Sequence, residues 1–237
     1  MNKPFTFKQF SINQDRCAMK IGTDGVLLGA WTSVKHNPFN VLDIGAGTGL
    51  LSLMIAQRSN AEQIEAIEID DDAFEQCVEN FENSPWNDRL FCFHASLLEY
   101  VEAVDEKFDL IICNPPFYSE DYKTHSKSRN LARFSDAMPM EHIVFAVIHF
   151  LSKKGRFSIV LPHGKEKEFI EEASLIGLFP NRILRVKGNA ESEIKRSLIE
   201  FSYQETDINI SELIIETSRD NYTQDYINLT KDFYLKM

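Results

Sequence analysis

Short apolar runs and longer amphipathic stretches alternate along the middle of the chain. Apolar runs of this length are typical of strands buried on both faces, whereas the stretches between them carry the spacing of helices. The predicted strands cover residues 41–44, 64–69, 90–94, 108–113 and 155–161, and the predicted helices 50–57, 70–83, 140–151 and 165–175. Strands that alternate with helices predict βαβ units and a mostly parallel sheet.

Both ends of the chain depart from this alternation. Residues 5–12 read as an edge strand or hairpin, and Thr23 and Asp24 offer caps for a helix with an apolar face. After Leu178, two strands at 181–186 and 195–203 predict a hairpin, followed by a further strand at 213–217 and a helix or irregular tail to Tyr234. We therefore expect one domain over residues 1–237, with an N-terminal hairpin and helix (1–35), a core (36–203) and a C-terminal extension (204–237).

Composition narrows the class of protein. Apolar residues make up 43% of the chain and charged residues 26%, which is ordinary for a globular protein. No apolar run is long enough for a membrane helix, and the N-terminus lacks the core of a signal peptide. The cysteines have no CxxC spacing, and Cys92 and Cys113 lie in apolar runs, so we expect buried free thiols in a reducing cytoplasm.

The sequence Val41–Leu50 joins the first core strand to a helix through Gly45, Gly47 and Gly49. Glycines let the backbone turn sharply and approach a ligand closely, at the sheet edge where open parallel sheets bind ligands. The spacing is GxGxG and lacks the GK[ST] ending of a phosphate-binding P-loop. Glu68 ends the next strand, where a carboxylate can accept hydrogen bonds from ribose hydroxyls. These features favour an adenosine-type ligand, with a tight structural turn as the alternative.

The tetrad Asn114-Pro115-Pro116-Phe117 directly follows the apolar strand 108–113, at the same edge of the sheet as the glycines. The two prolines remove two N–H donors, so the carbonyl of Pro115 and the side-chain oxygen of Asn114 remain as acceptors. Two convergent acceptors suit an NH₂ group, and Phe117 offers a flat face for stacking. Holding both N–H bonds aims the nitrogen lone pair at an electrophile, so orientation and electrostatics would supply the rate. The alternative is that the tetrad is only a structural turn that ends the strand.

With these motifs the sequence resembles class I S-adenosylmethionine-dependent methyltransferases that methylate nitrogen and carry an NPP[FY] tetrad. The segment Lys20–Trp31, the chain length and the ending Leu229–Leu235 are similar to the bacterial tRNA1(Val) adenine N6-methyltransferases, which modify the adenine 3′ of the anticodon. The resemblance implies a Rossmann-like α/β fold with a mostly parallel seven-stranded sheet and an antiparallel C-terminal hairpin. It also implies S-adenosylmethionine as cofactor and tRNA as substrate. We further expect a cytoplasmic monomer.

The resemblance assigns roles residue by residue. The cofactor would be held by Thr23, Asp24, Asp43, Gly45, Ala46, Gly47, Gly49, Glu68, Ser96 and Asn114. The target adenine would be held by Asn114, Pro115, Pro116 and Phe117. Relatives place an Asp where this chain has Ser96, and a serine hydroxyl accepts a hydrogen bond from the adenine amine more weakly than a carboxylate.

The net charge of −11 argues against a nucleic-acid partner, but the charge is unevenly distributed. Segment 118–133 carries four bases against two acids, and segment 182–196 carries five against two. These basic segments flank the proposed pocket and are candidates to contact RNA phosphates, with a solvated loop and hairpin as the alternative. Of these nine bases, those predicted as contacts are Lys123, Lys127, Arg129, Arg133, Arg182, Arg185 and Lys187.

Three functions remain in competition. A tRNA adenine N6-methyltransferase is favoured by the segment Lys20–Trp31. A methyltransferase of protein glutamine or of the guanine N2 of rRNA fits the tetrad equally well, because both targets are planar NH₂ groups. A domain that only binds RNA or protein is disfavoured by the intact glycines, Glu68 and Asn114. His163 is expected to cap a helix or face solvent rather than act as a base, and no histidine has the spacing of a metal ligand.

Overall fold

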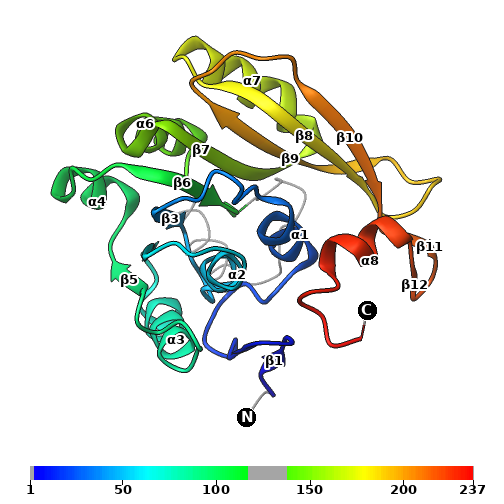
Figure 1. The fold of residues 1–237 in the computed structure, drawn as a ribbon, viewed down its shortest axis with the longest axis horizontal. Coiled ribbons are helices and arrows are strands. Elements are labelled where there is room, and N and C mark those ends of the chain that lie inside the picture. The colour runs from blue at the N-terminus through cyan, green and yellow to red at the C-terminus, as the bar shows by residue number, and fades with distance from the viewer. Residues whose placement is uncertain (1–2, 117–137, 237) are drawn as a thin grey trace, which may run out of the picture.

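The computed structural model describes residues 3–116 and 138–236. Its central sheet contains β3 (Asn40–Ile44), β4 (Gln63–Glu68), β5 (Leu90–His94), β6 (Phe108–Cys113), β7 (Leu151–Pro162), β8 (Phe179–Lys187), β9 (Ile194–Ser202) and β10 (Asn209–Ile214). Within the described residues these eight strands lie in the order β10-β8-β9-β7-β6-β3-β4-β5 (Figure 1). Only β9 runs antiparallel to its neighbours in this sheet.

Helices cover both faces of the sheet. One face carries α1 (Thr23–Trp31), α2 (Leu50–Arg58), α3 (Asp71–Glu82) and α8 (Gln224–Thr230), and is called the α1–α2 face below. The opposite face carries α4 (Leu97–Ala103), α6 (Met140–Phe150) and α7 (Glu166–Leu175). Successive side chains of a strand point to opposite faces, so Leu110 and Ile112 join one core and Ile111 and Cys113 the other. The continuous apolar runs of the sequence follow from this two-sided burial.

The chain reverses its direction of travel across the sheet at β3. From β3 the next strands, β4 and β5, are added on one side, whereas β6 and β7 are added on the other. In the parallel register, Ile44 pairs with both Ile67 of β4 and Cys113 of β6. The residues that follow these three strands therefore meet at one edge, and such a switch point is where open α/β sheets bind ligands.

Small elements complete the fold. They are the hairpin β1 (Phe5–Thr6) and β2 (Ser11–Ile12), the 3₁₀ turn η1 (His163–Lys165), and the hairpin β11 (Glu216–Ser218) and β12 (Asn221–Tyr222). The two ends of the chain lie together, because Phe7 forms a backbone bridge with Tyr234 and Lys8 Nζ donates to the carbonyl of Lys231 (Figure 1). Within the described ranges, no helix is both long and apolar enough to cross a bilayer.

The predicted fold class is confirmed, and so is the C-terminal hairpin, formed by β8 and β9. The sheet contains one strand more than the seven predicted. That strand, β10, pairs in parallel with β8, and its first four residues are exposed. The strand predicted at 213–217 instead covers the end of β10 and the start of β11. Asp70 caps α3, whereas α1 begins after Gly22 without the predicted side-chain cap from Thr23 or Asp24. Cys113 is a buried free thiol, whereas Cys92, on the edge strand β5, is half-buried.

The start of α2 depends on a glycine with no room for a side chain. Gly49 has a φ of +78°, and a Cβ there would lie 2.5 Å from Phe81 Cε1 and 2.9 Å from Cys77 Sγ. We expect Gly49→Ala to lower the free energy of unfolding by roughly 2–4 kcal/mol, the sum of backbone strain and overpacking. Denaturant unfolding measures the loss.

Gly177→Ala is the matched control for that measurement. Gly177 has a φ of +84°, but a Cβ there would have no atom within 4 Å, so its replacement costs only the backbone strain, about 1 kcal/mol. Equal losses in the two variants would contradict the proposed contact of the glycine loop with α3.

Candidate active site

The loop between β3 and α2 is tied to the end of β4. The N–H groups of Gly45 and Ala46 both donate to the carbonyl of Ile67, at 3.0 Å each. Gly45 and Gly47 have φ values of +74° and +54°, which side chains rarely allow. A Cβ at Gly47 would have no atom within 4 Å, so the backbone of the loop faces open space.

Glu68 fixes the same loop with its carboxylate. Oε2 accepts the N–H of Gly47 at 2.7 Å, and Oε1 accepts the N–H groups of Ile69 and Asp70 at 2.9 and 3.0 Å. A carboxylate has about four acceptor positions, so three are filled and one remains on Oε2. A contact from Glu68 to two ligand hydroxyls therefore requires the N–H of Gly47 to give up its bond.

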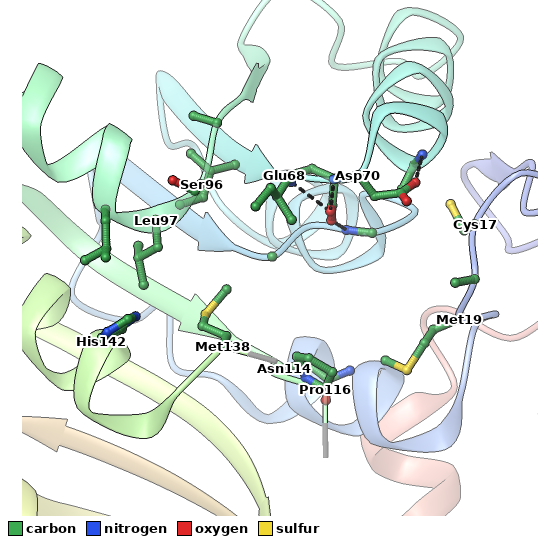
Figure 2. A pocket seen from close by; sticks show the side chains of 18 of the residues that line it. Cys17, Met19, Glu68, Asp70, Ser96, Leu97, Asn114, Pro116, Met138 and His142 are labelled. Atoms are coloured by element: carbon green, nitrogen blue, oxygen red, sulfur yellow. Dashed lines mark hydrogen bonds between the residues drawn. The ribbon is translucent and has the colours of Figure 1, made fainter. Parts of the chain in front are cut away.

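A cavity of about 380 Å³ opens over the ends of β3, β4 and β6. Figure 2 shows Glu68 and Asp70 on one side of it and Asn114 and Pro116 on the other. It is lined by Cys17, Ala18, Met19, Gly45, Gly47, Ile67, Glu68, Ile69, Asp70, Ala73, Ala95, Ser96, Leu97, Leu98, Asn114, Pro116, Met138, Pro139 and His142. The volume is in the range of small-molecule sites, and the apolar walls with a few polar groups are typical of them.

Asn114 presents an uncommitted amide to this cavity. The residue is half-buried, and within the described residues no group hydrogen-bonds its side chain. Helix α1 packs close beside it, since a Cβ on Gly25 would lie 3.6 Å from Asn114 Nδ2 and 3.0 Å from Leu50 Cδ2. Pro115 is buried and Pro116 lines the cavity. Packing against α1 thus positions the amide at the wall of the cavity.

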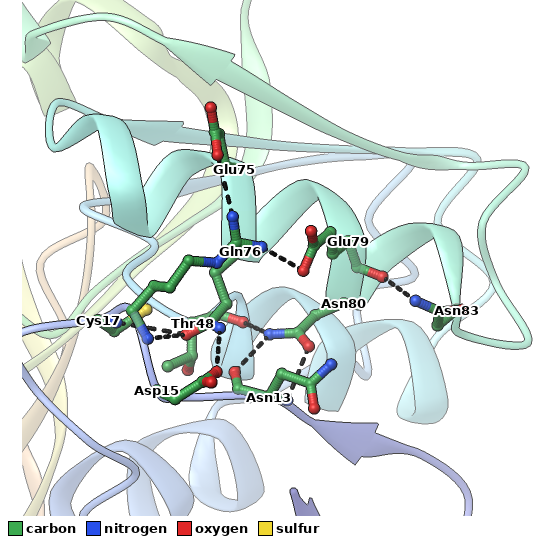
Figure 3. A network of polar contacts seen from close by, with 10 residues as sticks. Asn13, Asp15, Cys17, Thr48, Glu75, Gln76, Glu79, Asn80 and Asn83 are labelled. Atoms are coloured by element: carbon green, nitrogen blue, oxygen red, sulfur yellow. Dashed lines mark hydrogen bonds and ion pairs between the residues drawn. The ribbon is translucent and has the colours of Figure 1, made fainter. Parts of the chain in front are cut away.

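The N-terminal strap, residues 13–19, forms another wall of the cavity and is fastened to α3 by two buried amides (Figure 3). Asn80 accepts the N–H of Asn13 at 2.8 Å and donates to the carbonyls of Asn13 and Thr48, both at 2.9 Å. Gln76 accepts the N–H groups of residues 16 and 17, at 3.0 and 3.3 Å. Asn80 therefore joins the strap and the glycine loop through one side chain.

Acidic groups set the electrostatics of the cavity. Glu68 and Asp70 both line it. Burial, followed by the negative charges of Glu68 and Asp70, raises the pKa of Cys17 to about 12. A site with this charge favours a cationic ligand.

Asp43 is completely buried at the end of β3. Its Oδ2 accepts the N–H and the hydroxyl of Ser52, at 3.1 and 2.8 Å, while Oδ1 has no partner within the described residues. Burial raises the pKa of Asp43 to about 7, against the opposing effect of the Ser52 hydrogen bonds. Asp43 thus holds the first turn of α2 in place.

Ser96 begins α4 as its N-cap. Its hydroxyl accepts the N–H of Glu99 at 3.2 Å, and the Glu99 carboxylate accepts the N–H of Ser96 at 2.9 Å, which completes a capping box. The Ser96 hydroxyl keeps its own hydrogen and one lone pair, and it lines the cavity. A contact of Ser96 with an adenine amine stays a prediction.

The structure brings together part of the predicted site. Of the predicted residues, the cavity is lined by Gly45, Gly47, Glu68, Ser96, Asn114 and Pro116. Those described but not lining it are Thr23, Asp24, Asp43, Ala46, Gly49 and Pro115. Asp24 instead binds Arg196 Nε of β9 at 2.7 Å. Phe117 lies outside the described residues, and the roles assigned to all of these residues stay predictions.

Sequence reasoning missed several residues that line the cavity, namely Cys17, Met19, Ile69, Asp70, Leu97, Leu98, Met138 and His142. Asp70 could have been found, because an acid two residues beyond Glu68 lies at the same strand end. Met19 and Cys17 carried no local signal, since only the side chains of α3 place the strap beside the cavity.

The predicted basic contacts of segment 182–196 are paired with acids in the structure. Arg185 binds Glu166 through two nitrogens, at 2.7 and 3.2 Å, Arg182 binds Glu200 at 3.1 Å and Lys187 binds Glu212 at 3.1 Å. This hairpin therefore offers less free positive charge than its sequence indicates. Lys123, Lys127, Arg129 and Arg133 lie outside the described residues.

His163 does not line the cavity. It begins η1, and its Nδ1 lies 3.1 Å from Glu166 Oε2 and 3.0 Å from Ser197 Oγ. Across residues 3–116 and 138–236, no group of three or more His, Cys, Asp or Glu side chains could hold a metal ion.

Three comparisons place the chain among known proteins. The family model "Methyltransferase small domain" matches residues 25–175. A Flavobacterium johnsoniae protein named "tRNA1(Val) (adenine(37)-N6)-methyltransferase" is 59% identical over 98% of this chain and 100% of its own length, and a Flavobacterium psychrophilum protein of that name is 57% identical over the same shares. The crystal structure of a predicted O-methyltransferase from Agrobacterium tumefaciens is 19% identical, with a TM-score of 0.67, over 89% of this chain and 96% of that one. This last similarity concerns the fold.

The attachment of the strap can be tested with Asn80→Ala. The substitution leaves the N–H and carbonyl of Asn13 and the carbonyl of Thr48 without their partner. We expect the free energy of unfolding to fall by roughly 2–3 kcal/mol, and amide hydrogen exchange of residues 13–19 to accelerate.

Asn83→Ala on the same helix is the control for Asn80→Ala. Asn83 makes one exposed bond, to the carbonyl of Glu79 at 2.7 Å, so the expected change in unfolding free energy is within about 0.5 kcal/mol. Unchanged exchange of the strap in Asn80→Ala would contradict its attachment through this side chain.

Asp43 predicts a pH dependence of stability. Its pKa is raised on folding, so the folded protein keeps a proton between about pH 4 and 7 that the unfolded chain releases. The contribution of this protonated carboxyl group to the free energy of unfolding is fully present below about pH 4 and is lost as the pH rises to about 7. We expect Asp43→Asn to remove this decline in unfolding free energy, measured by denaturant unfolding across that range, while Asp207→Asn at the surface keeps it. A parallel decline in Asp43→Asn would contradict the assignment.

Proposed function

The chain belongs to the tRNA1(Val) (adenine(37)-N6)-methyltransferase family, and on that premise we propose that it transfers a methyl group from S-adenosylmethionine to the exocyclic N6 of an adenine in tRNA. We propose adenine 37 of tRNA1(Val), on the 3′ side of the anticodon, as the target. The relatives that carry this name match the chain over nearly its whole length, which supports the same substrate.

The cavity fits the proposed cofactor. S-adenosylmethionine supplies a methyl group on a positively charged sulfonium, and the acids Glu68 and Asp70 suit a cation. The open backbone at Gly47 leaves space for the part of the cofactor near the glycine loop. Ile69, Leu97 and Leu98 give apolar walls for a base, and Glu68 keeps one acceptor position for a ribose hydroxyl. Cofactor and substrate share one cavity, since Asn114 lines the same space.

The observation that carries the proposal is the register of the sheet. Because Ile44 pairs with Cys113, the glycine loop and Asn114 leave adjacent strands at the same level. The side-chain oxygen of Asn114 is an acceptor without a partner in the described residues. The carbonyl of Pro115 is a second acceptor, and Pro116 after it has no N–H group. We propose that these two oxygens accept both hydrogens of the adenine amine.

This arrangement addresses the weak nucleophilicity of an aromatic amine. The nitrogen lone pair of adenine N6 is delocalised into the ring, and two acceptors on the N–H bonds favour the pyramidal geometry that frees it. The residues then orient the amine and leave its proton to solvent after methyl transfer, so most of the rate comes from positioning. Phe117, at the next position, is proposed to stack on the base.

The proposal extends to where the protein acts. We place the reaction in the cytoplasm, which the free thiols of the described cysteines support, and we expect a monomer.

Protein glutamine and the guanine N2 of rRNA also present planar NH₂ groups. We favour tRNA over both because the relatives at 57–59% identity carry the tRNA name. The test is methyl transfer from labelled S-adenosylmethionine to total tRNA lacking native modifications, followed by nucleoside mass spectrometry. N6-methyladenosine in one tRNA species is the expected result, and labelled rRNA or release factor without labelled tRNA would overturn the proposal.

Asn114→Ala removes the proposed side-chain acceptor. We expect kcat to fall by at least ~10²-fold, since a hydrogen bond made to the reacting group is lost. Cofactor binding, measured by calorimetry, should stay within about threefold, because the acceptor is aimed at the substrate amine. An equal loss of cofactor affinity and turnover would contradict this role.

A further inference from the structure

A second cavity, of about 530 Å³, lies away from the proposed active site. It is lined by Trp31, Ser33, Val34, Lys35, His36, Arg58, Arg156, Arg182 and Glu200, and is called the basic pocket below. The loop 33–36 precedes β3, Arg182 lies near the start of β8, and Glu200 lies near the end of the antiparallel β9. The basic pocket is therefore at the edge of the sheet opposite to Gly45 and Asn114.

Its charge is unusual for this protein. Four permanent cations, Lys35, Arg58, Arg156 and Arg182, line the basic pocket with Glu200 as the one carboxylate among the lining residues. The chain as a whole carries 36 acids against 25 bases. Among the lining cations Arg182 alone has an ion-pair partner in the described part of the chain, so the excess cations repel one another at a cost in free energy unless an anion joins them.

The contacts of the arginines also indicate a site for an anion. Arg182 is held by Glu200 at 3.1 Å and lies over the ring of Trp31, 4.3 Å from its centroid. Arg58 donates to the carbonyls of Gly29 and Thr32, at 2.6 and 2.8 Å, which fixes its position. Burial, and then repulsion from Arg182, lowers the pKa of Arg58, with Asp232 opposing this effect.

Arg156 is the arginine of the basic pocket whose side chain has no bonding partner among the described residues. It is half-buried, and within residues 3–116 and 138–236 it makes no hydrogen bond or ion pair. It pairs with Leu110 in the sheet, which places its side chain on the α1–α2 face among apolar neighbours. A guanidinium in this setting has five donors to offer in a planar fork that matches a phosphate.

A polar row continues beneath the basic pocket. Ser158 of β7 pairs with Glu200 of β9, which pairs with Arg182 of β8, so these side chains form a row on the α1–α2 face beside the apolar row of Val160, Leu198 and Leu184. The hydroxyls of Ser158 and Thr32 are buried without a partner in the described part of the chain. A buried polar group without a partner lowers the stability of the fold. Such a residue is expected where a binding site, and not the packing of the core, requires it.

We propose that the basic pocket binds a backbone phosphate of the RNA substrate, remote from the methylated base. This inference rests on the proposed function, which supplies an RNA as the polyanion. The spacing is compatible with a folded RNA, since the six residue-to-residue steps from Arg156 to Pro162 of β7 span about 20 Å along the strand toward the opposite edge of the sheet. Phosphate contacts position an RNA without reading its sequence, and they give an acidic protein a defined place to bind it.

Arg156→Glu tests the site in the full-length protein. We expect the KM for unmodified tRNA to rise roughly tenfold, because a charge-assisted contact is lost, with kcat and cofactor affinity unchanged. The slope of log affinity against log salt concentration should become shallower by about one. Arg156→Lys should recover most of the affinity, and thermal melting checks that each variant is folded.

Arg219→Glu is the matched control, because it makes the same change of charge at an exposed residue in the turn between β11 and β12. Its KM and salt slope should equal those of the parent protein. A KM for Arg156→Glu within twofold of the parent, or an equal rise in Arg219→Glu, would overturn the proposal.

Two further measurements distinguish a failure of the proposed phosphate site from a failure of the proposed activity. Filter binding of tRNA needs no methyl transfer, so binding that depends on Arg156 without any methylation would reject the proposed activity and keep the site. Methylation with binding independent of Arg156 would reject the site and keep the activity. Stabilisation by inorganic phosphate over chloride, lost in Arg156→Gln while tRNA affinity is unchanged, would assign the basic pocket to a small anion and overturn the RNA assignment.

Discussion

The parallel pairing of β3 with both β4 and β6 is the constraint on which the site depends. Ile44 pairs with Ile67 on one side and Cys113 on the other, so three strands end at the same level. The glycine loop, Glu68 and Asn114 are the residues that follow or end these strands. A slip of one residue in either pairing would turn a strand's core side chains toward the wrong face, so burial of the sheet also fixes the geometry of the cavity.

Buried polar side chains then hold the irregular segments that the sheet cannot hold. Glu68 binds the backbone of the glycine loop, Asp43 binds the first turn of α2, and Asn80 joins the N-terminal strap to the loop at Thr48. Removing any of these side chains would lower the stability of the fold, because its buried hydrogen-bond partners would be left unpaired. The result is a preorganised cavity whose acids favour a cation and whose wall includes the amide of Asn114, which has no hydrogen-bond partner among residues 3–116 and 138–236.

The strand-end motifs could be predicted because their residues are close in sequence and their strands are apolar. The expected position of Glu68 and Asn114 at one edge of the sheet is confirmed for that reason, and their roles stay predictions. Features assembled from distant residues could not be predicted: the strap depends on Gln76 and Asn80, and the basic pocket draws on helices, a loop and three strands. The positive charge of segment 182–196 was misleading, because its acidic partners come from elsewhere in the chain and from α7.

The central claim is that one cavity holds the methyl donor beside the amide that receives the target amine. A crystal structure of the protein with S-adenosylhomocysteine, the demethylated cofactor, tests this most directly. We expect the ribose at Glu68, the amino-acid part along Gly45 and Gly47, and the sulfur facing Asn114. Cofactor bound outside this cavity, or bound with its sulfur turned away from Asn114, would contradict the central claim.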